Sequence, residues 1–143
     1  MNAPHDTQSV SLRRVRCVAA ALLLAGCVHE PLGPLEPGLW GGVGVALTVG
    51  IGGLGEFEFD CAHGATSAPL HPYDGRFAVA GVYVREHGGP VGENEMPDEL
   101  EATYGGEVDG ASIRLTIRLE ADDQQIGPFT LRRDQAPTLR KCL

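Results

Sequence analysis

The sequence predicts an all-β fold, a meander of seven to eight antiparallel strands that forms a small barrel-like structure, with a β-sandwich as the alternative. From Leu39 onward apolar residues recur at every second position, as in half-buried strands. Asp-Gly pairs and glycine-rich stretches separate these runs, and no stretch has the spacing of an amphipathic helix. Sequential hairpins favour the barrel, because closure buries one face of every strand and removes exposed edges.

The first strand is expected to begin at Trp40 and to include residues 43–49, and the second is expected over residues 56–61. The core face of the first strand carries Val43, Val45, Leu47 and Val49. Trp40 opens this strand as a core residue or as a plug at one end of the barrel. The glycine-rich residues 50–55 turn the chain. In the second strand, strict alternation places Cys61 on the core face with Phe57 and Phe59.

A long third strand is expected over residues 76–86. Before it, residues 62–75 contain Pro69 and Pro72, so any strand there is short and at an edge. The pair Asp74-Gly75 predicts a hairpin turn into the long strand. Its core face is expected to carry Phe77, Val79, Gly81 and Tyr83. Residues 87–98 follow as a long loop.

Asp109-Gly110 predicts the next hairpin, because this dipeptide between alternating runs is the strongest short-range turn signal. With these residues as the turn, Val108 pairs with Ala111. The same register places Tyr104 opposite Leu115, Ala102 opposite Ile117, Leu100 opposite Leu119, Thr103 opposite Thr116 and Glu101 opposite Arg118. One face is then apolar and the other polar. A last strand over residues 126–132 follows a turn at 122–125.

Residues 1–26 have the organisation of an export signal. Three arginines (13, 14 and 16) precede an apolar run over residues 17–25, much shorter than the ~20 residues that a transmembrane helix needs. The run ends in Leu24-Ala25-Gly26-Cys27, which resembles the bacterial lipobox. The resemblance implies cleavage between Gly26 and Cys27 and attachment of lipid to the Cys27 thiol, which makes the membrane a partner of the chain. The alternative is an ordinary secretory signal cut nearby.

Residues 27–38 are predicted to be the lipid anchor and a proline-rich tether, and residues 39–143 the all-β domain. Prolines at 31, 34 and 37 favour an extended spacer, which could hold the domain about 30 Å from the bilayer. Val28, and not an aspartate, follows Cys27. In lipoproteins resembling those of enterobacteria, this implies the periplasmic face of the outer membrane if the host is Gram-negative.

Cysteine usage predicts one disulfide. The chain has four cysteines, of which Cys17 leaves with the signal and Cys27 carries lipid. Cys61 and Cys142 remain, in a compartment where disulfides persist, and we predict that they are bonded. Two unpaired buried thiols are the alternative. A bond closing a loop of about 80 residues contributes roughly 4 kcal/mol.

Charge and motifs narrow the function classes. Residues 1–26 carry three arginines and one aspartate, so the remainder, at −10, is more acidic than the whole chain at −8. Such a domain repels nucleic-acid phosphates, and we expect no nucleic-acid partner. No serine lies in a Gly-x-Ser-x-Gly elbow. Cys61 would be a nucleophile beside His63 only if it were unpaired, so no enzyme activity is predicted.

No metal or other cofactor is predicted. His63, His71 and His87 are the residues that would ligate zinc or copper, together with nearby carboxylates. No pair of them has the spacing that builds a site on one element. The alternative is that these histidines form hydrogen bonds with the loop backbone.

Several segments resemble those of small, uncharacterised exported bacterial proteins: EFDCAHG (58–64), YVREHGGPV (83–91), IGPFTL (126–131) and the terminal KCL. The resemblance implies a shared fold and assigns no functional residues. The sequence therefore predicts a lipid-anchored cell-envelope domain with a non-catalytic structural or binding role. Two alternatives are a calycin-like carrier of a small apolar ligand and a metal-binding envelope protein that uses the three histidines.

Overall fold

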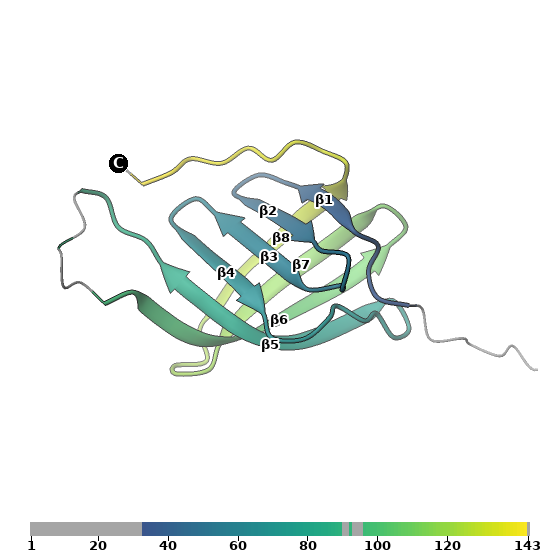
Figure 1. Cartoon of the computed structure of the whole chain (residues 1–143), viewed down its shortest axis with the longest axis horizontal. Helices are drawn as coiled ribbons and strands as arrows, with labels where there is room; N and C mark the ends of the chain where they lie inside the picture. Colours follow the sequence, from purple (N-terminus) through teal and green to yellow (C-terminus); the bar gives the residue numbers. More distant parts are fainter. Residues whose placement is uncertain (1–32, 90–91, 93–95, 143) are drawn as a thin grey trace, which may run out of the picture.

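A computed structural model describes residues 33–89, 92 and 96–142. Within them eight antiparallel strands follow one another in sequence order, and β1 pairs with β8 to close a barrel (Figure 1). The strands are β1 (Gly38–Gly41), β2 (Val45–Val49), β3 (Gly55–Phe59), β4 (Ala62–Thr66), β5 (Arg76–Arg85), β6 (Asp98–Asp109), β7 (Ser112–Leu119) and β8 (Gln125–Arg133). The predicted barrel-like meander is confirmed, and the sandwich alternative is wrong.

The antiparallel order places successive connections at alternate ends of the barrel. We call the end where β1 begins the proximal end; it carries the β2–β3, β4–β5 and β6–β7 connections. The other connections lie at the distal end. After β8 the chain reverses and runs back outside β1 as a C-terminal strap, residues 135–142, which reaches the distal end (Figure 1). The Asp134 amide donates to the Leu39 carbonyl (2.8 Å). Within the strap, Thr138 pairs with Val43, which lies between β1 and β2.

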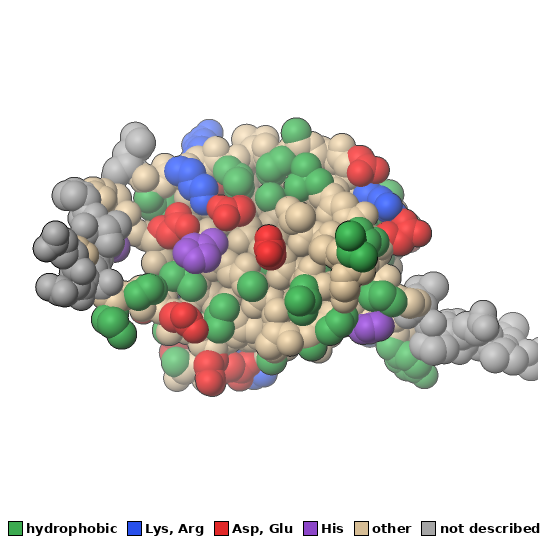
Figure 2. Space-filling model, viewed as in Figure 1, with side chains coloured by type: hydrophobic (Ala, Val, Ile, Leu, Met, Phe, Trp, Pro, Cys, Tyr) green, Lys and Arg blue, Asp and Glu red, His purple; other side chains and the backbone are tan. Residues whose placement is uncertain are grey.

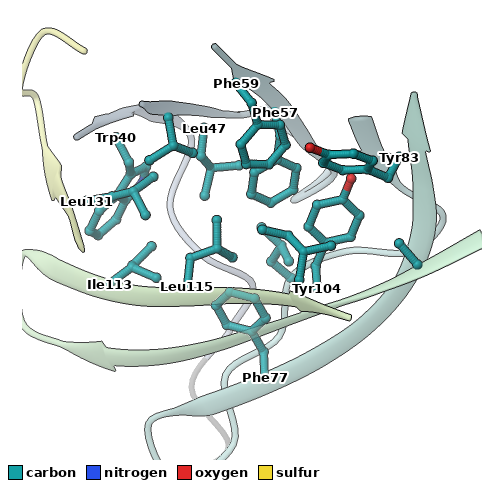
Figure 3. Packing of buried hydrophobic residues seen from close by; sticks show 14 of the residues in the cluster. Trp40, Leu47, Phe57, Phe59, Phe77, Tyr83, Tyr104, Ile113, Leu115 and Leu131 are labelled. Carbon is teal, nitrogen blue, oxygen red and sulfur yellow. The ribbon is translucent and has the colours of Figure 1, made fainter. Parts of the chain in front are cut away.

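Apolar side chains fill the barrel interior (Figure 3). The Tyr104 ring stacks on Phe57 with 4.3 Å between centroids, and Phe59 packs against Tyr83 at 5.3 Å. Aliphatic side chains occupy the space between these rings and Trp40, and those with no exposed surface include Leu47, Ile113, Leu115, Ile117 and Leu131. An eight-stranded barrel is just wide enough for its own side chains, as observed here.

Leu35 and Leu70 close the proximal end. Both are buried, and the Leu35 amide donates to the Leu70 carbonyl at 2.7 Å. From Leu35 onward, the segment predicted as a free tether therefore lies against the barrel. The predicted tether, residues 27–38, therefore overlaps the folded part of the chain from Leu35 onward.

The hairpin formed by β1 and β2 was hidden in the sequence. Gly42 donates to the Val45 carbonyl (3.0 Å) and Gly44 adopts a φ of +75°, so the chain reverses at residues 42–44. Val43 is 79 % exposed, and its predicted place on the core face is wrong. Trp40 belongs to β1 and is buried, as expected of a core residue. The reversal occurs without breaking the period-two apolar pattern, and for that reason the pattern read as one strand.

Cys61 lies outside the core. Phe59 pairs with Ala62, so Asp60 and Cys61 form the turn between β3 and β4, and Cys61 is exposed. Its predicted inward position is wrong because the alternating strand ends at Phe59. The expectation of an edge for residues 62–75 is also wrong, since β4 pairs with both β3 and β5. The prolines lie in the connection that follows β4.

Of the two Asp-Gly hairpins, only one forms as predicted. Asp74 and Gly75 adopt φ values of +50° and +72°, as a type I′ turn requires, and Tyr73 pairs with Arg76. At the second, Asp109 pairs with Ser112, and only Gly110 has a positive φ.

The predicted register of this second hairpin is wrong by two residues, because the turn residues are 110 and 111. The observed pairs include Ala102 with Leu119, Thr103 with Arg118, Tyr104 with Ile117 and Val108 with Ile113. Glycine at the first central position is the type II′ arrangement, whereas type I′ would need a positive φ at Asp109 as well. A shift of two preserves which side chains face inward, so the predicted separation into an apolar and a polar face survives.

Candidate functional site

The distal end is organised around the predicted disulfide, which the structure confirms. Cys61 and Cys142 are bonded across 81 residues of sequence, with 5.2 Å between their Cα atoms. The bond joins the β3–β4 turn to the end of the C-terminal strap. It therefore fixes a segment that pairs with the barrel elsewhere mainly through the Val43–Thr138 contact.

Ionic contacts on both sides of the disulfide hold the strap over the β3–β4 turn. Lys141 Nζ donates to Glu58 Oε2 (2.6 Å) and to the Phe59 carbonyl (3.3 Å), and lies 3.6 Å from Glu86 Oε2. The Arg140 backbone amide donates to Asp60 Oδ1 at 2.7 Å. The hydrogen bond to Glu58 is the main reason why the pKa of Lys141 is raised. These carboxylates therefore help to position the strap.

His63 and Glu86 form a carboxylate–imidazole pair beside these contacts. His63 lies on β4 opposite Glu58 of β3, and its Nδ1 is 2.7 Å from Glu86 Oε1. The hydrogen bond with His63 is the largest cause of the lowered pKa of Glu86, to which the charge of Lys141 also contributes. Glu86 thus remains ionised to lower pH than an isolated glutamate.

The same pairing orients a histidine base in many hydrolases, where a nucleophile lies within reach. Here the nearest sulfur candidate from the sequence, Cys61, is held in the disulfide. As long as that bond is intact, Cys61 has no thiol to activate. The pair is also linked to the strap, because Glu86 attracts Lys141.

The three histidines named as metal ligands are not brought together. His63 and His87 line one hollow of about 380 Å³ at the distal end, which Glu86, Met96 and Asp98 also border. A His87 ring nitrogen lies 3.1 Å from the Gly88 carbonyl oxygen. His71 lies in the β4–β5 connection at the proximal end. Figure 2 shows histidine side chains at both ends of the molecule, and among the described residues no three His, Cys, Asp or Glu side chains are grouped as a metal site.

Two further hollows lie on the outer wall formed by β5, β6 and β7. One, of about 560 Å³, is lined by residues that include Ala78, Gly105 and Thr116 and the charged Arg76 and Glu107. The other, of about 550 Å³, is lined by small, aliphatic, polar and charged residues: Ser67, Ala80, Gly81, Val82, Glu101, Ala102, Thr103, Arg118 and Glu120. Both face outward, away from the packed interior.

The residues of the predicted lipid-attachment site, Gly26 and Cys27, lie outside the described residues. Within the part of the chain that the structure describes, no helix has the length and apolar character to span a membrane. In comparisons of the chain with protein families, curated proteins and solved structures, none matches. The resemblance to small exported bacterial proteins therefore stays a prediction, and the function must be argued from this chain's own residues.

Sequence reasoning missed the ion pairs of Lys141 with Glu58 and Glu86. The predicted disulfide was the signal that could have found them. A bond between Cys61 and Cys142 places the adjacent Lys141 and Arg140 near the acidic outward residues of the strand that precedes Cys61, Glu58 among them. Only the partner that follows β5, Glu86, needs the three-dimensional register to be recognised.

Proposed function

We propose that the chain is a lipid-anchored domain of a bacterial cell envelope, attached through Cys27, with a non-catalytic structural or binding role. The observation that carries this proposal is the Cys61–Cys142 disulfide. Disulfides form and persist outside the cytoplasm, so the bond supports export, which the basic and apolar residues of positions 13–25 would direct. The lipobox-like residues before Cys27 support lipid attachment.

The arrangement of polar residues at the distal end supports a non-catalytic role. The strap is held there by Lys141, which contacts Glu58 and Glu86, and Glu86 in turn contacts His63. The packed interior supports binding from the outside of the barrel, because a carrier of the calycin kind needs space inside it. Any partner would then contact the outer wall or an end of the barrel.

Labelling with palmitate tests the lipid attachment in the full chain produced in a Gram-negative host. The wild-type chain should take up the label, and Cys27→Ser should not, since its side chain cannot form the thioether. Cys17→Ala is the matched control and should label normally, because Cys17 lies within the apolar run that is removed. Unchanged labelling of Cys27→Ser, or an unlabelled wild-type chain, would overturn the proposal.

We further propose the periplasmic face of the outer membrane as the location in such a host, on the basis of Val28. Separation of inner and outer membranes tests this. Val28→Asp should move the labelled protein to the inner membrane, whereas Val28→Ala should leave it in the outer membrane.

A further inference from the structure

Exposed apolar side chains gather at the proximal end of the barrel. In the described chain, four of the six large exposed hydrophobic residues lie there: Leu39, Ile51, Leu54 and Tyr73. Of these four residues, Ile51 and Tyr73 are the most exposed, at 96 % and 71 %, and Leu54 is 47 % exposed. Figure 2 shows hydrophobic side chains at the right of the molecule, the side where the described chain begins. We call Ile51, Leu54 and Tyr73 the apolar tip.

The β2–β3 turn that carries Ile51 and Leu54 is internally fixed. Gly53 donates to the Gly50 carbonyl at 2.8 Å, and Gly50 donates to the Leu54 carbonyl at 2.9 Å. Residues 50–54 contain no charged side chain. An uncharged turn that keeps an isoleucine almost fully in water suits insertion into an apolar boundary better than exposure.

The same turn is tied to the point where the chain enters the barrel. Leu35 donates to the Leu70 carbonyl (2.7 Å), and Leu70 donates in turn to the Gly53 carbonyl (2.8 Å). Pro34 also lies against this turn, since a Cβ atom on Gly53 would be 2.8 Å from Pro34 Cβ. Pro34 and Leu35 are therefore fixed to the β2–β3 turn, which carries two residues of the apolar tip, Ile51 and Leu54.

The chain outside the structure is short on this side. Five residues lie between Cys27 and Gly33, so six Cα-to-Cα steps join them, and fully extended these steps span at most about 22 Å. A lipid on Cys27 would keep the proximal end within that distance of the bilayer, at a high effective concentration. The Tyr73 side chain is suited to a place near the bilayer surface, because the amphipathic ring of tyrosine favours the membrane–water boundary.

We propose that the apolar tip inserts into the headgroup–acyl boundary of the leaflet to which Cys27 anchors the chain, so that the barrel stands on its proximal end. This inference rests on the proposed lipid attachment. The distal end, with the disulfide and the hollow lined by His63 and His87, then faces away from the membrane. The folded domain thus binds the membrane through the apolar tip as well as through the lipid on Cys27.

Quenching of tryptophan fluorescence by brominated lipids tests this orientation. The chain from Cys27 to Leu143 has one free thiol when Cys61 and Cys142 are bonded, and that thiol can be coupled to a maleimide lipid in phosphatidylcholine vesicles. Ile51→Trp reports on the apolar tip. Val43→Trp is the matched control, because Val43 is also exposed but lies in a turn at the distal end. Buried Trp40 contributes the same background to both.

Ile51→Trp should be quenched several-fold more strongly than Val43→Trp, with emission shifted to the blue. Tyr73→Trp, a conservative replacement of one aromatic ring by another, should be quenched as well. Equal quenching of Ile51→Trp and Val43→Trp would overturn the inference. Absence of quenching in both Ile51→Trp and Tyr73→Trp would overturn it as well. Chemical coupling supplies the anchor whether or not cells add lipid, so this result is independent of the palmitate experiment that tests the proposed function.

Discussion

The phenol oxygen of Tyr104 occupies the space that a side chain on Gly64 would need. A Cβ atom built on Gly64 overlaps this oxygen. The Tyr104 hydroxyl donates to the Val82 carbonyl on the intervening strand at 2.7 Å, and its ring is fully buried against Phe57. Gly64 of β4 and Tyr104 of β6 are therefore a complementary pair across β5.

We expect Gly64→Ala to lower the free energy of unfolding by about 1–3 kcal/mol, since overpacking of a core has costs of that size. Gly105→Ala is the matched control. A Cβ there meets its nearest atom, the Thr116 carbonyl oxygen, at an ordinary 3.6 Å, so stability should change little. Denaturant titration measures both, and equal effects of the two variants would contradict the packing described here.

Tyr104→Phe should cost about 1 kcal/mol, because it removes a buried hydrogen bond to Val82. In that background Gly64→Ala should cost less than in the wild-type chain, since the clashing oxygen is gone. Part of the cost should remain, because the Val82 carbonyl is also close to the new methyl group. A double-mutant cycle gives the coupling directly, and strictly additive effects would argue against contact between the two sites.

Loss of the disulfide should destabilise the protein without opening the barrel. Cys142→Ser is expected to lower the free energy of unfolding by about 2–5 kcal/mol. The strap would then be released, and trypsin should cleave after Arg140 and Lys141 faster than in the wild-type chain. Far-UV circular dichroism should remain that of a β-sheet protein, since the pairing of β1 with β8 does not involve the strap.

The control for this prediction is a count of thiols in the exported wild-type protein, denatured without reductant. Neither Cys61 nor Cys142 should react with an alkylating reagent. Two reactive thiols would show that the bond does not form in the cell. Cys61 would then need to be reconsidered as a nucleophile beside His63.

Glu86 contributes to the free energy of unfolding, and this contribution is lost at acid pH. Its pKa lies below the usual value near 4.5 in the folded protein, mainly through the hydrogen bond with His63. A lowered carboxylate pKa contributes stability above the unfolded value, and this contribution is lost as pH falls through the folded value. Unfolding free energies measured from pH 6 down to about pH 3 should therefore fall more steeply for the wild-type chain than for Glu86→Gln.

Because the pair is partly exposed, this difference should be small and should weaken at high salt. Glu56→Gln serves as a control for loss of one negative charge, since Glu56 lies on β3 away from the strap contacts. Identical pH profiles for wild type and Glu86→Gln at low salt would contradict the role assigned to Glu86.

The features of the fold that could be predicted from sequence are those that local chemistry determines. The Asp74-Gly75 turn formed as expected, because both residues tolerate a positive φ. The reversal at Gly42–Gly44 was missed, because the apolar alternation continues through it. The register after Asp109 was misplaced, since an Asp-Gly pair does not say which residue begins the turn.

At the candidate site, counting cysteines was enough to predict the bond between Cys61 and Cys142. The hydrogen bond between His63 and Glu86 could not be predicted in the same way. These two residues are 23 positions apart and meet because β4 and β5 pair in a particular register. That register depends on the whole barrel and not on any local motif.

The mass of the intact protein, extracted from the membrane fraction of a Gram-negative host, tests the central claim most directly. We predict a chain that begins at Cys27 and is heavier than its sequence by a diacylglyceryl group and, where the host adds it, one amide-linked acyl chain. It should be lighter by two hydrogens for the Cys61–Cys142 bond. A chain that begins at another residue, or one that begins at Cys27 without lipid, would contradict the proposal that a lipid on Cys27 holds this barrel at a membrane.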